Sequence, residues 1–167
     1  VDCVAGTSAR VVDTRKTLPG WRALDKYAVT VGGGANHRHG LSGGVLIKDN
    51  HIDALGGIAS AVAEARRSAP TTVKIEVEVR NERELLEAID AGADIVMLDN
   101  MSVEEMKHAV AIAKGRVALE ASGNITSANV RAVAETGVDY ISVGAITHSV
   151  SALDISFILH PSKSEGA

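Results

Sequence analysis

The chain has 167 residues, of which 46% are hydrophobic and 23% charged, so we expect one domain over residues 1–167 with a substantial core. The formal net charge of −4 argues against a nucleic-acid partner, because proteins that neutralise many phosphates carry a basic surface. No stretch reaches the roughly 18 apolar residues of a membrane span, and the single cysteine, Cys3, excludes an intramolecular disulfide and favours a reducing cytoplasm.

The first half of the chain contains two predicted strands, each followed by a predicted helix. Apolar runs predict strands at residues 10–13 and 45–49, and helices are expected near residues 21–31 and 57–68. Aromatic residues make up only 2% of the chain, so the core must be built from Val, Ile, Leu and Ala. This composition favours parallel strands that are buried on both faces.

From residue 74 the sequence repeats one unit, in which a short β-branched run is followed by an amphipathic segment and a glycine. Strands are predicted at residues 74–79, 93–98, 117–121 and 140–143. The helices between them have a capping residue at the start and a glycine at the end: Asn81 and Gly92, Ser102 and Gly115, Thr126 and Gly137.

Strands separated by single helices with short links require parallel pairing and right-handed crossovers, so the predicted fold is α/β. Six such strands, or seven if residues 153–159 form one, can make an incomplete parallel α/β barrel of the TIM-barrel type or an open sheet. Charged residues at strand ends favour the barrel, because its carboxyl-terminal mouth tolerates single charges and is where barrel enzymes carry out their chemistry. These residues are Asp13, Lys48, Glu78, Asp99 and Glu120.

Three segments supply cations that together predict a site for a polyanion. They are Arg15, Lys16 and Thr17 after the first strand, His37 and Arg38 after a run of three glycines, and Lys48 at the end of the second strand. Glycines let the backbone approach a ligand, and the basic side chains supply hydrogen-bond donors. By itself the first segment is also typical of a solvated surface and the second of a flexible linker, whereas a lysine without a role is not expected at the end of an apolar strand.

Acidic and glycine-containing segments predict a second part of the same site. Glu78 and Asp99 end consecutive strands, so their carboxylates can converge on sugar hydroxyls or on Mg²⁺, which proteins hold with one or two carboxylates and substrate phosphates. Ser122-Gly123-Asn124 and Val143-Gly144-Ala145 follow the last two strands. Barrels commonly bind a phosphate at loops in these positions.

The order of these motifs resembles the quinolinate phosphoribosyltransferase (nicotinate-nucleotide pyrophosphorylase) family over nearly the whole chain. The resemblance rests on Asp13-Thr14-Arg15-Lys16-Thr17, Asn36-His37-Arg38, Leu46-Ile47-Lys48-Asp49-Asn50-His51, Glu76-Val77-Glu78, Leu98-Asp99-Asn100, Glu120-Ala121-Ser122-Gly123-Asn124 and Ile141-Ser142-Val143-Gly144. It implies a seven-stranded, incomplete barrel with Mg²⁺ as cofactor, in a dimer or a hexamer. The family's N-terminal domain does not lie within these 167 residues.

The resemblance also implies a reaction and a role for each site residue. Quinolinate and phosphoribosyl pyrophosphate would give nicotinate mononucleotide, pyrophosphate and carbon dioxide. Catalytic positions would be Lys16, Lys48, Glu78 and Asp99. Quinolinate would bind at Arg15, His37, Arg38 and Lys48, and the anionic substrates would also contact Lys16 and Thr17. Mg²⁺ and the phosphoribosyl group would lie at Glu78 and Asp99. The 5-phosphate would bind at Ser122, Gly123, Asn124, Ser142, Val143 and Gly144.

Two alternatives to this function remain open from the sequence. One is a phosphoribosyltransferase with the same barrel and a different acceptor. The other is a non-catalytic barrel that binds phosphate without turnover.

Overall fold

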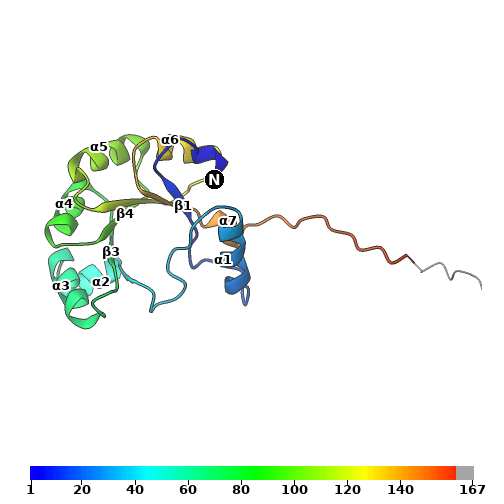
Figure 1. Cartoon of the computed structure of the whole chain (residues 1–167). Coiled ribbons are helices and arrows are strands. Elements are labelled where there is room, and N and C mark those ends of the chain that lie inside the picture. The colour runs from blue at the N-terminus through cyan, green and yellow to red at the C-terminus, as the bar shows by residue number, and fades with distance from the viewer. Residues whose placement is uncertain (161–167) are drawn as a thin grey trace, which may run out of the picture.

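Six parallel strands form one curled sheet in a computed structural model that describes residues 1–160 (Figure 1). The strands lie in the order β1-β6-β5-β4-β3-β2. Within the described residues no strand pairing joins β1 to β2, so the sheet is not closed by hydrogen bonds. The predicted incomplete α/β barrel is therefore confirmed. The strands are β1 (Arg10–Val12), β2 (Val45–Ile47), β3 (Ile75–Val79), β4 (Ile95–Asp99), β5 (Ala118–Ser122) and β6 (Tyr140–Ser142).

Helices cover the outer face of the sheet. Figure 1 shows α2 to α6 as an arc outside the strands, and α1 and α7 beside each other at the opposite side. No helix in the described part of the chain is long and apolar enough to cross a membrane. The helices are the 3-10 helix η1 (Asp2–Val4) and α1 (Arg22–Val31), α2 (Asp49–Leu55), α3 (Ile58–Ser68), α4 (Glu82–Asp90), α5 (Val103–Ala113), α6 (Val130–Ala134) and α7 (Ala145–His148).

Alternation along the central strands separates an apolar outer face from a polar inner face. The outward side chains, which pack under the helices, are fully or almost fully buried: Val77, Val79, Val96, Leu98, Leu119, Ala121 and Ile141. Paired residues of parallel strands point to the same side of a sheet. The register pairs Glu78 with Met97, Met97 with Glu120, and Asp99 with Ser122, so the polar side chains of β3, β4 and β5 share the inner face.

Most of the predicted helix boundaries are confirmed. The side chain of Asn81 accepts a hydrogen bond from the Glu84 amide at 3.0 Å, and Ser102 and Glu105 form the predicted capping box. Gly92 has the expected positive φ of 82°. Thr126 is not the cap of α6, because that helix begins only at Val130, after a turn in which the Asn129 side chain accepts from the Thr126 amide.

Two short α-helices, α2 and α7, were not predicted from the sequence. The strand predicted at residues 45–49 ends at Ile47, because α2 begins at Asp49 with Lys48 as its N-cap. The ring of His51 accepts a hydrogen bond from the Lys48 amide at 2.9 Å, which closes this turn. The four-residue helix α7 follows β6 after Gly144.

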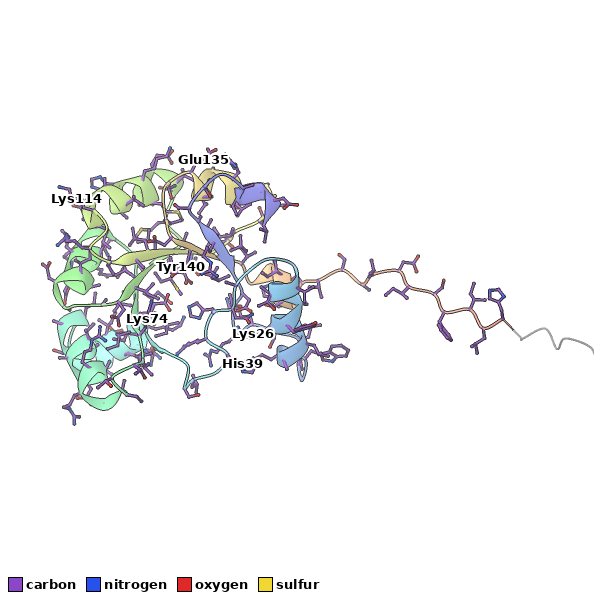
Figure 2. The ribbon with its side chains drawn as sticks, viewed as in Figure 1. Lys26, His39, Lys74, Lys114, Glu135 and Tyr140 are labelled. Atoms are coloured by element: carbon purple, nitrogen blue, oxygen red, sulfur yellow. The ribbon has the colours of Figure 1, made fainter. Side chains whose placement is uncertain are left out.

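Residues 153–159 do not form the seventh strand that the sequence left open. This segment makes no strand pairing, and Leu153, Ile155 and Phe157 are 81%, 77% and 86% exposed. Its side chains stand clear of the rest of the chain beyond α7 (Figure 2). An apolar run forms a strand only where a sheet edge pairs with its backbone groups, and here the chain leads away from both edges.

Candidate active site

A cavity of about 330 Å³ opens at the carboxyl-terminal end of the strands. Most of the side chains that the sequence singled out line it: Arg15, Lys16, His37, Arg38, Lys48, Glu78, Asp99, Ser122 and Ser142. They come from the ends of five different strands and from two loops. The structure thus brings the predicted cationic and acidic residues to one mouth.

A second cavity, of about 480 Å³, adjoins the first and shares Lys16, Asp99, Ser122 and Ser142 with it. Its other lining residues include the predicted phosphate-loop residues Gly123, Asn124 and Gly144. Two predicted residues line neither cavity. The hydroxyl of Thr17 accepts a hydrogen bond from Arg22 at 3.2 Å, and the Val143 amide donates to the carbonyl of Val12 at 3.0 Å.

The loop after β5 requires a glycine at position 123. Gly123 has a φ of +103°, and a Cβ there would lie 2.3 Å from Oδ1 of Asn100. The same oxygen accepts a hydrogen bond from Nδ2 of Asn124 at 3.0 Å. The loop therefore holds its backbone close to the end of β4, in a shape that leaves the backbone accessible to a ligand.

The loop that follows β1 is fixed from behind by α1 and α7. Arg22 donates to the carbonyl of Arg15 at 3.0 Å, and the hydroxyl of Thr147 donates to the carbonyl of Lys16 at 2.7 Å. These contacts engage the two carbonyl oxygens, while both side chains line the first cavity. The backbone of the loop is therefore fixed while the side chains of Arg15 and Lys16 reach the cavity.

Lys48 and Glu78 form an ion pair across neighbouring strands, with Nζ 2.8 Å from Oε2. Asp99 lies on the next strand, and its Oδ1 accepts a hydrogen bond from the Asn100 side chain at 3.0 Å. Carboxylate oxygens suit Mg²⁺, but these two residues belong to no three-ligand cluster in the described part of the chain. Two carboxylates, those of Glu78 and Asp99, fit a Mg²⁺ ion whose remaining ligands come from substrate phosphates.

Sequence reasoning missed a buried polar network under the mouth. Asp13 and Lys26 are 0% and 3% exposed and form an ion pair between the end of β1 and helix α1. Asn36 donates to Asp13 at 2.5 Å and to the carbonyl of Lys26 at 2.9 Å. In the sequence, Asp13 stood out as a strand-end charge and as the first residue of one family motif, and Lys26 lay within the helix expected near residues 21–31.

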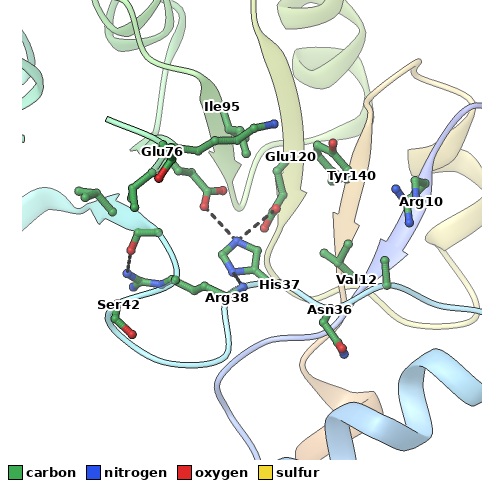
Figure 3. Close-up of a pocket in the computed structure, with 17 residues that line it drawn as sticks. Arg10, Val12, Asn36, His37, Arg38, Ser42, Glu76, Ile95, Glu120 and Tyr140 are labelled. Carbon is green, nitrogen blue, oxygen red and sulfur yellow. Dashed lines mark hydrogen bonds and ion pairs between the residues drawn. The ribbon is translucent and has the colours of Figure 1, made fainter. Parts of the chain in front are cut away.

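A second buried cluster joins His37 to two glutamates inside the barrel (Figure 3). Nε2 of His37 lies 2.9 Å from Glu76 and 3.5 Å from Glu120. One oxygen of each carboxylate, Oε1, is buried without a hydrogen-bond partner. Burial, and then the charge of Glu76, raise the pKa of Glu120 to about 7, so Glu120 is in its proton-binding range near neutrality.

The same carboxylates act on the His37 ring. The hydrogen bond to Glu76 raises the pKa of His37, and burial opposes this. Nδ1 of the ring, however, accepts a hydrogen bond from the Arg38 amide at 2.8 Å, which requires that Nδ1 carry no proton. The geometry therefore favours the neutral ring with its proton on Nε2.

Arg15 and Arg38 bring two guanidinium groups to one cavity. Burial and then the charge of Arg15 lower the pKa of Arg38. Arg38 also donates through Nη1 to the carbonyl of Gly44 at 2.9 Å. Two cations that repel each other in a partly desolvated cavity favour an anion between them.

Comparison with known proteins gives consistent matches. Residues 1–158 match the family described as "Quinolinate phosphoribosyl transferase, C-terminal domain". The chain is 49% identical over 156 residues to the probable nicotinate-nucleotide pyrophosphorylase (carboxylating) of Bacillus subtilis, covering 93% of this chain and 54% of that protein. It is 44% identical over 158 residues to the human nicotinate-nucleotide pyrophosphorylase (carboxylating), covering 93% and 53% of the two chains.

A solved structure agrees with these relatives. The nicotinate-nucleotide pyrophosphorylase from Francisella tularensis superposes with a TM-score of 0.90 at 53% identity, over 93% of this chain and 55% of that one. The chain thus spans about half the length of the curated relatives it matches.

Proposed function

The chain belongs to the quinolinate phosphoribosyltransferase family, and we propose that it forms the barrel of an enzyme that transfers a phosphoribosyl group to quinolinate in NAD biosynthesis. The observation that carries the proposal is the pair of arginines, Arg15 and Arg38, that face the cavity also lined by Lys48. Quinolinate is a dianion, and this arrangement offers cations for both of its carboxylates.

The cationic side of the mouth would orient the nucleophile. The ring nitrogen of quinolinate lies beside a carboxylate and is a poor nucleophile, so its position decides the rate. Arg15, Arg38 and Lys48 would hold the two carboxylates and direct the nitrogen at the anomeric carbon. Lys16 lines both cavities and can therefore meet the anionic substrates from either side.

The acidic side would stabilise the reacting sugar. The C–O bond to pyrophosphate breaks as the C–N bond forms, through a state with positive charge on the ribose ring. Glu78 and Asp99 lie on neighbouring strands at this mouth and would stabilise that charge electrostatically. The loop residues Ser122, Gly123, Asn124, Ser142 and Gly144 line the adjoining cavity and would bind the 5-phosphate.

Mg²⁺ is part of the proposal. Glu78 and Asp99 would hold it together with the substrate's phosphates, and it would supply positive charge that offsets the charge of the pyrophosphate leaving group. After the transfer, the cationic ring nitrogen would stabilise the electron pair left on the adjacent carbon when the carboxylate departs as carbon dioxide, and a proton from solvent would then bind to that carbon. This last step requires little from the protein.

The quaternary structure and cellular location are further parts of the proposal. We infer a homodimer or a hexamer in the cytoplasm. Support comes from exposed apolar side chains on α1 and at its N-cap, which are Trp21, Leu24, Tyr27 and Val31. The single cysteine, Cys3, suits a reducing compartment.

The test is a turnover assay of the chain together with a separately expressed N-terminal segment of a relative, using Mg²⁺, phosphoribosyl pyrophosphate and quinolinate labelled in the carboxylate beside the ring nitrogen. The expected result is labelled carbon dioxide and nicotinate mononucleotide in equal amounts. Transfer to another nitrogen heterocycle, with none to quinolinate, would contradict the proposed acceptor.

A further inference from the structure

Four atoms of His37 make hydrogen bonds to other residues. Three of these partners lie outside the proposed substrate-binding set, and the fourth is Arg38. Its amide donates to Oδ1 of Asp13 at 2.8 Å, and its carbonyl accepts from Nζ of Lys26 at 3.1 Å. Its ring uses Nε2 toward Glu76 at 2.9 Å and accepts the Arg38 amide at Nδ1. Both backbone groups and both ring nitrogens are therefore engaged.

These contacts leave the His37 ring without a nitrogen for a substrate carboxylate. Nε2 is the donor nitrogen, and it points to two buried glutamates, Glu76 and Glu120, that are 4% and 2% exposed (Figure 3). Nδ1 is the acceptor nitrogen, and a carboxylate offers no proton to it at neutral pH. Binding a substrate directly would require the ring to leave a buried acceptor.

The neighbouring Arg38 depends on this arrangement. The segment from Gly32 to Gly44 links α1 to β2 and contains only an isolated bridge at Ala35, so regular secondary structure does not fix its path. The Arg38 amide is instead fixed by the ring before it, and its guanidinium by the carbonyl of Gly44. A side chain that is fixed before a ligand arrives loses less conformational entropy on binding.

We propose that His37 is a positioning residue, which fixes the Arg38 backbone so that the guanidinium faces the quinolinate carboxylates. Asp13 and Lys26 hold the backbone of His37, and Glu76 and Glu120 hold its ring. The buried glutamates thus act on substrate affinity through a chain of contacts, although they touch no substrate. This inference rests on the proposed function, because quinolinate is the ligand that Arg38 would meet.

A double-mutant cycle on quinolinate affinity tests the inference. The variants are His37→Leu, Arg38→Ala and their combination, and the dissociation constant is measured by titration calorimetry. We expect His37→Leu to weaken binding about tenfold or more, since small displacements of a positioning group have large effects. In the Arg38→Ala background, His37→Leu should have no further effect. Additive losses would show that His37 binds quinolinate itself and would overturn the inference.

Two further variants separate positioning from a loss of folding. Glu76→Met removes the acceptor of the ring while filling its volume, and its effect should also vanish in the Arg38→Ala background. His37→Asn places an acceptor oxygen near the position of Nδ1, so it should recover part of the affinity lost in His37→Leu. A folded His37→Asn variant that binds as weakly as His37→Leu contradicts a role for the Arg38 amide contact.

Nitrogen NMR of the protein without ligand tests the role of His37 independently of quinolinate binding. It reports the protonation of the His37 ring and the mobility of the Arg38 side chain. Nδ1 of His37 should carry no proton, Nε2 should carry one, and Arg38 Nε should become more mobile in His37→Leu. If the unmodified protein binds no quinolinate, the proposed function fails, while these resonances still decide the inference. Unchanged Arg38 mobility in His37→Leu would overturn it.

Discussion

Lys48 and Glu78 face each other across β2 and β3, with 2.8 Å between Nζ and Oε2. The pair connects the cationic half of the mouth to its acidic half. Glu78 is largely buried, whereas the Lys48 side chain is about half exposed and lines the mouth cavity. Lys48 therefore has room to exchange its partner for a substrate carboxylate.

Lys48→Ala should abolish measurable quinolinate binding and leave the fold intact. Removing one member of a charge pair that becomes desolvated when the substrate binds weakens binding by about 2–5 kcal/mol. Titration calorimetry measures the effect, and Lys107→Ala, an exposed lysine on α5, serves as the matched control. Unchanged quinolinate affinity in a folded Lys48→Ala variant would show that Lys48 is structural.

Glu78→Gln and Asp99→Asn should impair the use of phosphoribosyl pyrophosphate much more than the binding of quinolinate. Both substitutions keep the shape of the side chain and remove its negative charge, which we propose acts on Mg²⁺ and on the ribose. The measurement is kcat/KM for phosphoribosyl pyrophosphate in the active assembly, alongside the quinolinate dissociation constant. Equal losses for both substrates would indicate a general folding defect.

Gly123→Ala should weaken phosphoribosyl pyrophosphate binding roughly tenfold, because the new Cβ would displace Asn100 and with it the neighbouring loop. Its positive φ adds about 1–2 kcal/mol of strain in the folded state. Gly40→Ala is the control, since a Cβ at Gly40 meets nothing within 4 Å. Equal affinity in the two variants would remove the Gly123 loop from the phosphate site.

The free energy of unfolding should fall as the pH rises from about 5 to about 8. Glu120 has a raised pKa in the folded protein, so the folded state binds more protons than the unfolded one across this window. The Glu120 contribution is fully present below its ordinary pKa of 4.5 and is lost as the pH passes about 7. This amounts to about 3 kcal/mol, since one pKa unit is worth about 1.4 kcal/mol.

Denaturant unfolding at several pH values checks this slope. Glu120→Gln should flatten it, because the amide cannot ionise, whereas Glu135→Gln on the exposed surface should leave it unchanged. A Glu120→Gln variant with the original slope would place the titrating group elsewhere.

The chain tested alone should show little or no phosphoribosyl transfer, because its relatives are about twice as long and a dianion site needs every cation. Adding a separately expressed N-terminal segment of a relative should increase turnover of labelled quinolinate. Near-full turnover by the 167-residue chain alone would contradict the expectation that a further segment contributes to the site.

The sequence by itself determined the order of the six strands and of the main helices, and most of the side chains that reach the mouth. Hydrophobic periodicity, capping residues and terminal glycines are local signals, and parallel strands necessarily end at the same edge of a sheet. Arg15, Lys48, Glu78 and Asp99 could therefore be placed together without coordinates, and the structure brings them to one cavity.

Only the tertiary structure decided what lies beneath that mouth. Glu76 and Glu120 belong to β3 and β5, which are separated by β4, and they meet at His37 because the sheet curls and a loop enters it. The failure of residues 153–159 to form a strand has a related cause. Whether an apolar run forms a strand, and whether a carboxylate is buried, both depend on residues distant in sequence. The tertiary structure places such residues beside Glu76 and Glu120, and within the described part of the chain it places no strand beside residues 153–159.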